Sequence, residues 1–400
     1  MQLDDILILD CSRLLPGPYA TQLLADLGAT VIKIEEPERG DYARKMAPIG
    51  ESGHGEIFEA VNRGKRSVSL DLTDETARKA FYELVETADV VFETFRPGVT
   101  ERLGIDYDTL VEYNEELVYA SLSGFGGTGP NAERAGHDLN YAGETGLLDM
   151  TRPDEDSKPV IPGYPMVDMA SGLLSAFGIV SALLARERGG DGASGEDGEG
   201  DVGGTYLDLA MTDTMLSFAQ VFASGAFAGR TPRPGKTMLT GEFPCYDVYR
   251  TADDRYLTVA VLEPKFWRAL CETIERPELV EKHLSDDPAI REAVRETLQA
   301  VFETRTMDEW LDEFDGVDTA VGGVYTVTEA FDHEQTRARG MVVESDGSPP
   351  RIGFPIHDAD VDADGSAVPT RLPDHGEHTA SVLREAGVSD GTIARLTRND

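Results

Sequence analysis

The sequence is short of positive charge. Its 400 residues contain 36 Lys and Arg against 74 Asp and Glu, which gives a formal net charge of −38 at pH 7. Proteins bind nucleic acids mainly by neutralising phosphates with Lys and Arg, and they bind anionic lipid surfaces in the same way. No concentrated basic patch interrupts the acidic sequence. The charge balance therefore argues against nucleic acids and membrane surfaces as partners.

Cysteine and long apolar runs are also scarce. Cys11, Cys245 and Cys271 are far apart, and the sequence has no C-x-x-C pair or Cys/His cluster, so we expect reduced cysteines and no zinc site. No run approaches the roughly 18 apolar residues of a spanning helix. The first residues, MQLDDILILDCSR, lack the basic start and cleavage site of a signal peptide. We therefore expect a cytoplasmic protein.

The acidic excess is larger than solubility requires. Like charges at this density destabilise a compact chain in dilute buffer, but in molar salt the screening length falls to about 3 Å. The composition therefore predicts a halophilic protein. Residues 189–204 are rich in Gly and acidic residues and have little apolar surface to bury, so we expect a flexible surface insertion there.

Short apolar runs alternate with helical patterns in the first half of the chain, which is typical of βαβ units. We expect strands at residues 6–10, 30–34, 67–72, 88–93 and 117–123, and a long buried helix at residues 166–186. This pattern predicts an α/β fold with a mostly parallel sheet. A smaller α+β region follows, with a hairpin around residues 252–254 and helices at residues 264–274, 289–302 and 307–314. Residues 341–373 read as an extended return that precedes further helical residues.

Two small basic clusters lie beside predicted strand ends. NRGKR (residues 62–66) contains Arg63 and Arg66, and FRPGVTER (residues 95–102) contains Arg96 and Arg102. They suit a polyanionic ligand such as the phosphates of a nucleotide-like molecule, although surface ion pairs would explain them equally simply. The G-x-G-x-x-G spacing of a dinucleotide fold is absent.

Three further residues are candidates for acid–base chemistry. His137, in GHDLNY, follows a glycine-rich loop, and a histidine there can exchange protons near neutral pH, although a lone histidine is more often structural. Asp168 begins the long apolar helix, and Glu263 directly precedes Pro264 at the start of another. Helix capping is the simpler explanation of both carboxylates.

Several motifs in fixed order resemble the family of class III CoA-transferases and α-methylacyl-CoA racemases. They are LDCSRLLPGPYATQLLADLGATVIKIEEPERGDYAR, NRGKRSVSLDL, ETFRPGVTERLGI, SLSGFGGTGP and GEHT. The resemblance implies a large doubly wound α/β domain built from both chain ends, a smaller central α+β domain and an interlocked homodimer with its active site at the subunit interface. It implies domains at residues 1–225 and 226–335, with residues 336–400 completing the large domain.

The resemblance is strongest to the racemase branch. His137, Asp168 and Glu263 match the racemase catalytic residues, whereas transferases usually have an aromatic residue in place of His137. Glu36, however, stands where many racemases have an arginine near CoA. The resemblance and the basic clusters together predict CoA contacts at Lys33, Arg63, Arg66, Arg96, Arg102, Asn140 and Tyr141.

The implied reaction inverts the carbon next to the thioester carbonyl of a 2-methylacyl-CoA. Two acid–base groups must then flank one carbon, with Asp168 on one face and His137, oriented by Glu263, on the other. Backbone N–H groups at the start of the Asp168 helix would hold the enolate oxygen, with no metal or organic cofactor. The alternative is a CoA-transferase, in which Asp168 is the nucleophile and forms an aspartyl-CoA thioester.

The acidic composition generates a first prediction. Activity towards an acyl-CoA is expected to be highest in molar KCl or NaCl, because screening then removes the self-repulsion of the acidic surface. The measurement is the initial rate across a salt series at constant pH. Highest activity in salt-free buffer would contradict it.

Overall fold

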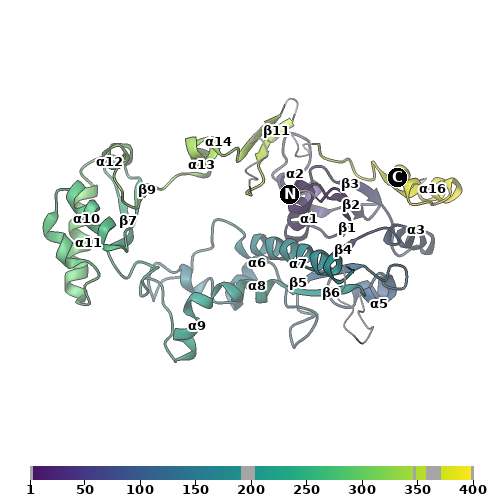
Figure 1. The fold of residues 1–400 in the computed structure, drawn as a ribbon, viewed down its shortest axis with the longest axis horizontal. Helices are drawn as coiled ribbons and strands as arrows, with labels where there is room; N and C mark the ends of the chain where they lie inside the picture. Colours follow the sequence, from purple (N-terminus) through teal and green to yellow (C-terminus); the bar gives the residue numbers. More distant parts are fainter. Residues whose placement is uncertain (1–2, 191–202, 346–347, 357–370, 398–400) are drawn as a thin grey trace. The chain divides into compact units, whose positions relative to one another are not determined.

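The computed structural model describes residues 3–190, 203–345, 348–356 and 371–397, so most of the predicted insertion at residues 189–204 lies outside the described residues. The chain folds into two units (Figure 1). Unit 1 contains Met1–Gly146, Pro162–Ala219 and Gln335–Asp400, and unit 2 contains Leu147–Ile161 and Gln220–Glu334.

Unit 1 is built on a six-stranded sheet in which every neighbouring pair of strands is parallel. Its strands are β1 (Leu7–Cys11), β2 (Thr30–Glu35), β3 (Arg66–Ser69), β4 (Val90–Glu93), β5 (Val118–Ser123) and β6 (Thr205–Ala210). The spatial order is β3-β2-β1-β4-β5-β6, so the chain winds outward in one direction from β1 and in the other from β4. The α/β fold with a parallel sheet is confirmed, and the five predicted strands are present with ends shifted by up to three residues.

Helices cover both faces of this sheet. One face packs against α1 (Pro16–Asp26) and α7 (Met166–Gly190), and the other against α3 (Glu75–Val85), α15 (Thr379–Glu385) and α16 (Asp390–Leu396). The strand residues alternate between these faces, so that Leu9 joins the apolar core beneath α3 while the neighbouring Asp10 faces α1. The other helices of unit 1 are η1 (Tyr42–Lys45), α2 (Glu56–Val61), α4 (Val99–Leu103), α5 (Tyr107–Leu110), α6 (Asp138–Glu144) and α8 (Met211–Phe218).

The long helix α7 corrects one expectation. By length and composition it is apolar enough to cross a membrane, because small and apolar residues fill Met166–Gly189 with few charges. It packs along α1 and against β5 and β6, and 44% of its most apolar stretch is buried within the chain. These contacts are those of a core helix that is covered on one side.

Unit 2 is an α+β unit with a three-stranded antiparallel sheet in the order β7-β8-β9. The predicted hairpin is present as β7 (Tyr246–Arg250) and β8 (Tyr256–Ala260), and β9 (Val321–Gly323) adds the third strand. Buried Trp267, Phe302 and Trp310 form the centre of its core. Its helices are η2 (Asp149–Thr151), α9 (Gln220–Phe227), α10 (Pro264–Thr273), η3 (Pro277–Lys282), α11 (Pro288–Phe302), α12 (Met307–Phe314) and α13 (Val327–Asp332).

The segment that follows unit 2 returns to unit 1. It contains α14 (Glu334–Ala338) and a hairpin of β10 (Val342–Ser345) and β11 (Ser348–Ile352), which the sequence pattern did not predict. Backbone N–H groups of Ser67 and Ser69 donate to His378 and Thr379, which fixes the start of α15 against β3. The last part of the chain therefore completes the face of the sheet that α3 also covers.

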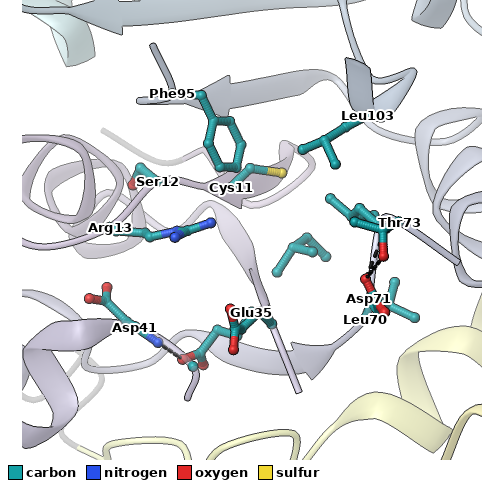
Figure 2. A pocket seen from close by; sticks show the side chains of 14 residues that line it. Cys11, Ser12, Arg13, Glu35, Asp41, Leu70, Asp71, Thr73, Phe95 and Leu103 are labelled. Atoms are coloured by element: carbon teal, nitrogen blue, oxygen red, sulfur yellow. Dashed lines mark hydrogen bonds between the residues drawn. The ribbon is translucent and has the colours of Figure 1, made fainter. Parts of the chain in front are cut away.

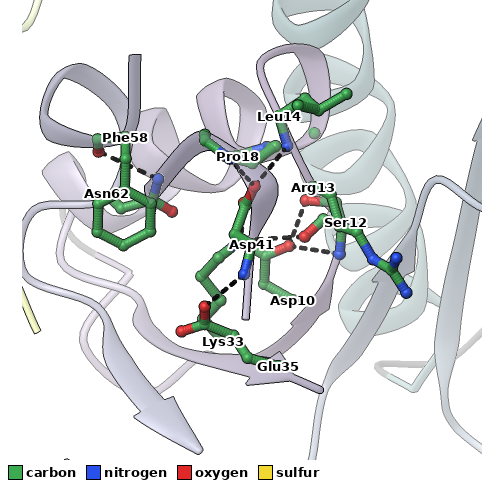
Figure 3. A network of polar contacts seen from close by, with 12 residues as sticks. Asp10, Ser12, Arg13, Leu14, Pro18, Lys33, Glu35, Asp41, Phe58 and Asn62 are labelled. Atoms are coloured by element: carbon green, nitrogen blue, oxygen red, sulfur yellow. Dashed lines mark hydrogen bonds and ion pairs between the residues drawn. The ribbon is translucent and has the colours of Figure 1, made fainter. Parts of the chain in front are cut away.

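A buried ionic network joins the carboxyl ends of β1 and β2 to the loops that follow them (Figure 3). Lys33 Nζ lies 2.9 Å from Asp41 Oδ2, and Lys65 Nζ lies 3.0 Å from Asp10 Oδ2. Arg44 holds both oxygens of Glu35, at 2.7 and 2.8 Å. All six side chains are buried. Burial alone would raise the pKa of Glu35, but Arg44 and Lys33 outweigh it and lower that pKa to about 2.

This network predicts a large loss of stability on replacing Lys33 by Met. The change leaves the Asp41 carboxylate buried without a counter-ion, so the free energy of unfolding is expected to fall by about 3–5 kcal/mol. Chemical denaturation at constant salt measures it. The double variant Lys33→Met/Asp41→Asn is expected to recover most of the loss. Lys79→Met, which removes an exposed partner of Glu75, serves as the control, and a Lys33→Met loss no larger than the control's would contradict the prediction.

Candidate functional site

A pocket opens in unit 1 at the carboxyl ends of β1, β2, β3 and β4 (Figure 2). It is lined by residues that directly follow these strands, including Ser12, Glu36, Leu70 and Phe95. The pocket lies where the strand order reverses between β1 and β4. Open α/β sheets bind their ligands in this crevice, because the loops diverge there and leave the strand ends accessible.

One arginine lines this pocket, and two more are sequence neighbours of lining residues. Figure 2 shows Arg13 extending into it, with its guanidinium carbon 5.1 Å from the centroid of the Phe95 ring. Arg96 follows Phe95, and Arg102 lies beside the lining residue Leu103; both side chains are exposed. Among the described residues, none of these three arginines forms an ion pair with a carboxylate. They are therefore free to meet an anion, and Arg13 is a candidate that the sequence patterns did not single out.

Three other predicted CoA contacts are buried or paired in unit 1. Lys33 has no exposed surface and donates to the Ser12 carbonyl besides its ion pair with Asp41. Arg66 begins β3, at the end of the strand remote from the pocket, and binds both oxygens of Glu385 at 2.7 and 2.8 Å. Arg63 is buried, and its nearest charges are Arg351, Glu59 and Asp26. We leave these three residues out of the proposed nucleotide site.

Asp168 lies in the first turn of α7 and is half-buried. Burial, followed by the negative charge of Asp138, raises the pKa of Asp168 to about 7. A carboxyl group with this pKa exchanges a proton readily near neutral pH. The same residue is close to Tyr141, because its charge contributes to the raised pKa of that buried phenol.

The residue after His137 links the start of α6 to the start of α7, where Asp168 lies. His137 precedes α6, its side chain is exposed, and its backbone N–H donates to Asn140 Oδ1 at 3.0 Å. The next residue, Asp138, accepts the backbone N–H groups of Val167 and Asp168 at 2.8 and 3.0 Å on one carboxylate oxygen. The start of α6 and the start of α7 are thereby joined, and Asn140 acts here as a cap of α6.

These bonds correct one part of the expected mechanism. The N–H groups of Val167 and Asp168 are occupied by Asp138, and the N–H of Met169 donates to the Pro165 carbonyl. They are not available for an enolate oxygen. At the start of α6, the N–H of Asn140 donates to the His137 carbonyl at 2.8 Å, and the N–H groups of Asp138 and Leu139 precede it in the first turn, where a helix supplies no acceptor of its own.

Tyr141 packs into a slot made by two glycines. A Cβ atom at Gly124 would lie 2.3 Å from Tyr141 Oη, and one at Gly136 would lie 2.6 Å from Tyr141 Cε1. Any side chain at either position would displace the ring. Arg96 also acts on this phenol, since its positive charge opposes the rise in the pKa of Tyr141. The charges of both Arg96 and Asp168 therefore act on the Tyr141 phenol.

Glu263 belongs to unit 2. It is exposed, occupies the position before α10 and makes no side-chain cap there. Capping therefore does not explain this carboxylate, and its approach to His137 stays a prediction. Among the residues that the structure describes, no group of three or more His, Cys, Asp or Glu side chains is arranged to hold a metal ion.

Comparisons with known proteins agree with this geometry. The profile of CoA-transferase family III matches residues 3–379. A succinyl-CoA:mesaconate CoA-transferase of Haloarcula hispanica is 35% identical, over 98% of both chains. The human alpha-methylacyl-CoA racemase is 33% identical, over 99% of this chain and 96% of its own. The crystal structure of a CAIB/BAIF family protein from Brucella suis superimposes with a TM-score of 0.81 at 32% identity, covering 96% of this chain and 99% of that one.

The match spans the whole parallel sheet, the pocket at its switch point and both helix starts that carry His137 and Asp168. Racemases and CoA-transferases are both found at this level of similarity. An enzyme acting on acyl-CoA thioesters is consistent with both groups. The chain therefore belongs to CoA-transferase family III.

Proposed function

We propose that the protein is an α-methylacyl-CoA racemase, which inverts the α-carbon of 2-methylacyl-CoA thioesters. The observation that carries this proposal is the bridge between the start of α6 and the start of α7. Asp138 directly follows His137 and hydrogen-bonds to the backbone of Asp168, which joins the two segments that carry the proposed acid–base side chains. Inversion needs two such groups on opposite faces of a carbon, whereas acyl transfer through an aspartate needs only the carboxylate.

The protonation of Asp168 supports this assignment. A pKa of about 7 leaves both the acid and the carboxylate form of Asp168 populated at neutral pH. A racemase needs both forms, because the same group removes the proton in one direction of the reaction and returns it in the other. His137 serves the opposite face of the α-carbon. The enolate oxygen formed in between needs hydrogen-bond donors in a dry site, and the N–H groups that begin α6 beside His137 fill this role.

CoA would reach this centre from the pocket at the switch point. Its nucleotide part occupies the pocket, with phosphates near Arg13, Arg96 and Arg102, and the pantetheine arm passes Arg96 and Tyr141 towards Asp168. The sequence supports this path because Phe95 lines the pocket and Arg96 is the next residue. CoA enters as part of the substrate, and the proposed reaction uses no metal or other cofactor.

A homodimer would complete the site. Exposed apolar side chains follow one side of α7, with Leu173 54% and Phe177 67% accessible, and Leu184 continues the row. Side chains of this size are usually covered when they form a row on a helix. Burial by a second subunit is consistent with an active site at the subunit interface.

The test is incorporation of solvent deuterium at the α-carbon of 2-methylacyl-CoA in the absence of any acceptor acid. The wild-type enzyme is expected to exchange this proton. Asp168→Asn and His137→Gln are each expected to lower the exchange rate by about 10²–10⁴-fold, because each removes one acid–base group. CoA-ester binding, measured by calorimetry, should remain close to that of the wild type.

A matched control is Asp108→Asn, which replaces an exposed aspartate in the first turn of another helix of unit 1. Its exchange rate is expected to be that of the wild type. A requirement for an acceptor acid, together with hydroxylamine trapping of an acyl group at Asp168, would identify a CoA-transferase instead. Thioester binding without exchange or transfer would overturn both assignments.

A further inference from the structure

Asp138 is placed to act on Asp168 in two ways. Its Oδ1 atom accepts the N–H groups of Val167 and Asp168 at 2.8 and 3.0 Å, so it fixes the first turn of α7. Its carboxylate also brings a negative charge next to the half-buried Asp168 side chain. No other acidic residue occupies that first turn. One side chain therefore sets both the position and the electrostatic surroundings of Asp168.

The helix geometry explains why this charge matters. The N-terminus of a helix carries a partial positive charge, which favours an ionised carboxylate in the first turn. Burial of Asp168 opposes this effect and raises its pKa, and the Asp138 charge raises it further. Asp138 occupies two of the N–H groups that carry this positive charge, and its own charge opposes ionisation of Asp168.

The other charged and titratable groups around Asp168 are few. Helix α6 contributes Asp138 and Tyr141, with His137 just before it, and the segment after β4 contributes Arg96 near the Tyr141 phenol. From α1, Tyr19 packs against α7 near Gly172, one turn further along the helix. Among these groups, Asp138 is the one whose negative charge acts directly on Asp168.

We propose that Asp138 is a positioning residue for Asp168: its carboxylate anchors the first turn of α7 and places a negative charge beside the Asp168 side chain. The inference rests on the proposed racemase function for its catalytic meaning. The charge adds to the effect of burial on the protonation of Asp168, and the two hydrogen bonds hold the first turn of α7 at the start of α6. An amide at position 138 would preserve the two hydrogen bonds and remove the negative charge.

Two substitutions separate these effects. Asp138→Asn retains an oxygen that accepts both N–H groups, since Asn caps helices as well as Asp does. It is expected to fold normally and to lower the pKa of Asp168, because one neighbouring negative charge is removed. Asp138→Ala removes both the charge and the cap, and is expected to lower kcat further and to reduce the unfolding temperature.

The pKa of Asp168 is measured directly by NMR titration of protein labelled with ¹³C at aspartate Cγ, with the signal assigned by its loss in Asp168→Asn. The limb of the kcat–pH profile that belongs to Asp168 is expected to move to lower pH by the same amount. Asp208→Asn is the matched control, because Asp208 also accepts a backbone N–H, that of Gly127, elsewhere in unit 1. Neither the titration nor the pH profile should change in this control.

An unchanged Asp168 titration in Asp138→Asn would overturn the inference. If that variant does not fold, Asp138→Ser keeps a capping oxygen without the charge and gives the same comparison. The titration of Asp168 does not depend on catalytic turnover. The Asp138 inference and the racemase function can therefore be refuted independently. Absence of deuterium exchange in the wild type would overturn the racemase function and leave the effect of Asp138 on Asp168 open to measurement.

Discussion

The structure depends on a set of opposite charges buried at the carboxyl ends of β1 and β2. Asp10, Glu35 and Asp41 face Lys33, Arg44 and Lys65, so three negative and three positive side chains are removed from water together. Burial of one such ion alone would cost several kcal/mol, and only complete pairing makes the arrangement stable. The network is therefore cooperative: each partner is needed because the others are already buried.

This network determines the shape of the pocket. Glu35 also accepts the backbone N–H of Asp41 at 2.9 Å and the hydroxyl of Ser67 at 2.7 Å, and Arg44 donates to the Pro373 carbonyl at 3.0 Å. The loop after β2, the strand β3 and the returning C-terminal segment are thus attached to one carboxylate. The walls of the pocket are rigid because their backbone is fixed from below.

The buried pairs also explain how an acidic protein binds an anionic substrate. With a net charge of −38, the chain repels CoA at long range. The lysines and Arg44 beneath the pocket are neutralised by their partners, so they contribute little to attraction. In the proposed site, Arg13, Arg96 and Arg102, for which the described residues offer no carboxylate partner, would supply the local positive potential. Binding is expected to rely on these few contacts at short range.

Much of the fold follows from local sequence. Apolar runs of strand length and amphipathic helical patterns indicated the parallel sheet, the hairpin in unit 2 and the helices that follow it. The family motifs led to His137 and Asp168, which lie on two helix starts that Asp138 joins. These features could be predicted because hydrophobic periodicity and motif order can be read from the linear sequence, without knowledge of tertiary contacts.

What the sequence alone could not decide is which charged side chains are paired and buried. Lys33 and Arg66 look like phosphate ligands until strand order places them against Asp41 and Glu385. Arg13 and Asp138 could not be singled out from the sequence, because their contacts are with residues that are distant in the chain. Arg13 lies over Phe95, and Asp138 hydrogen-bonds to the start of α7. The sequence determined the elements and the chemical groups. The tertiary structure decided their partners, because contacts between distant residues fix the burial and the neighbouring charges of each group.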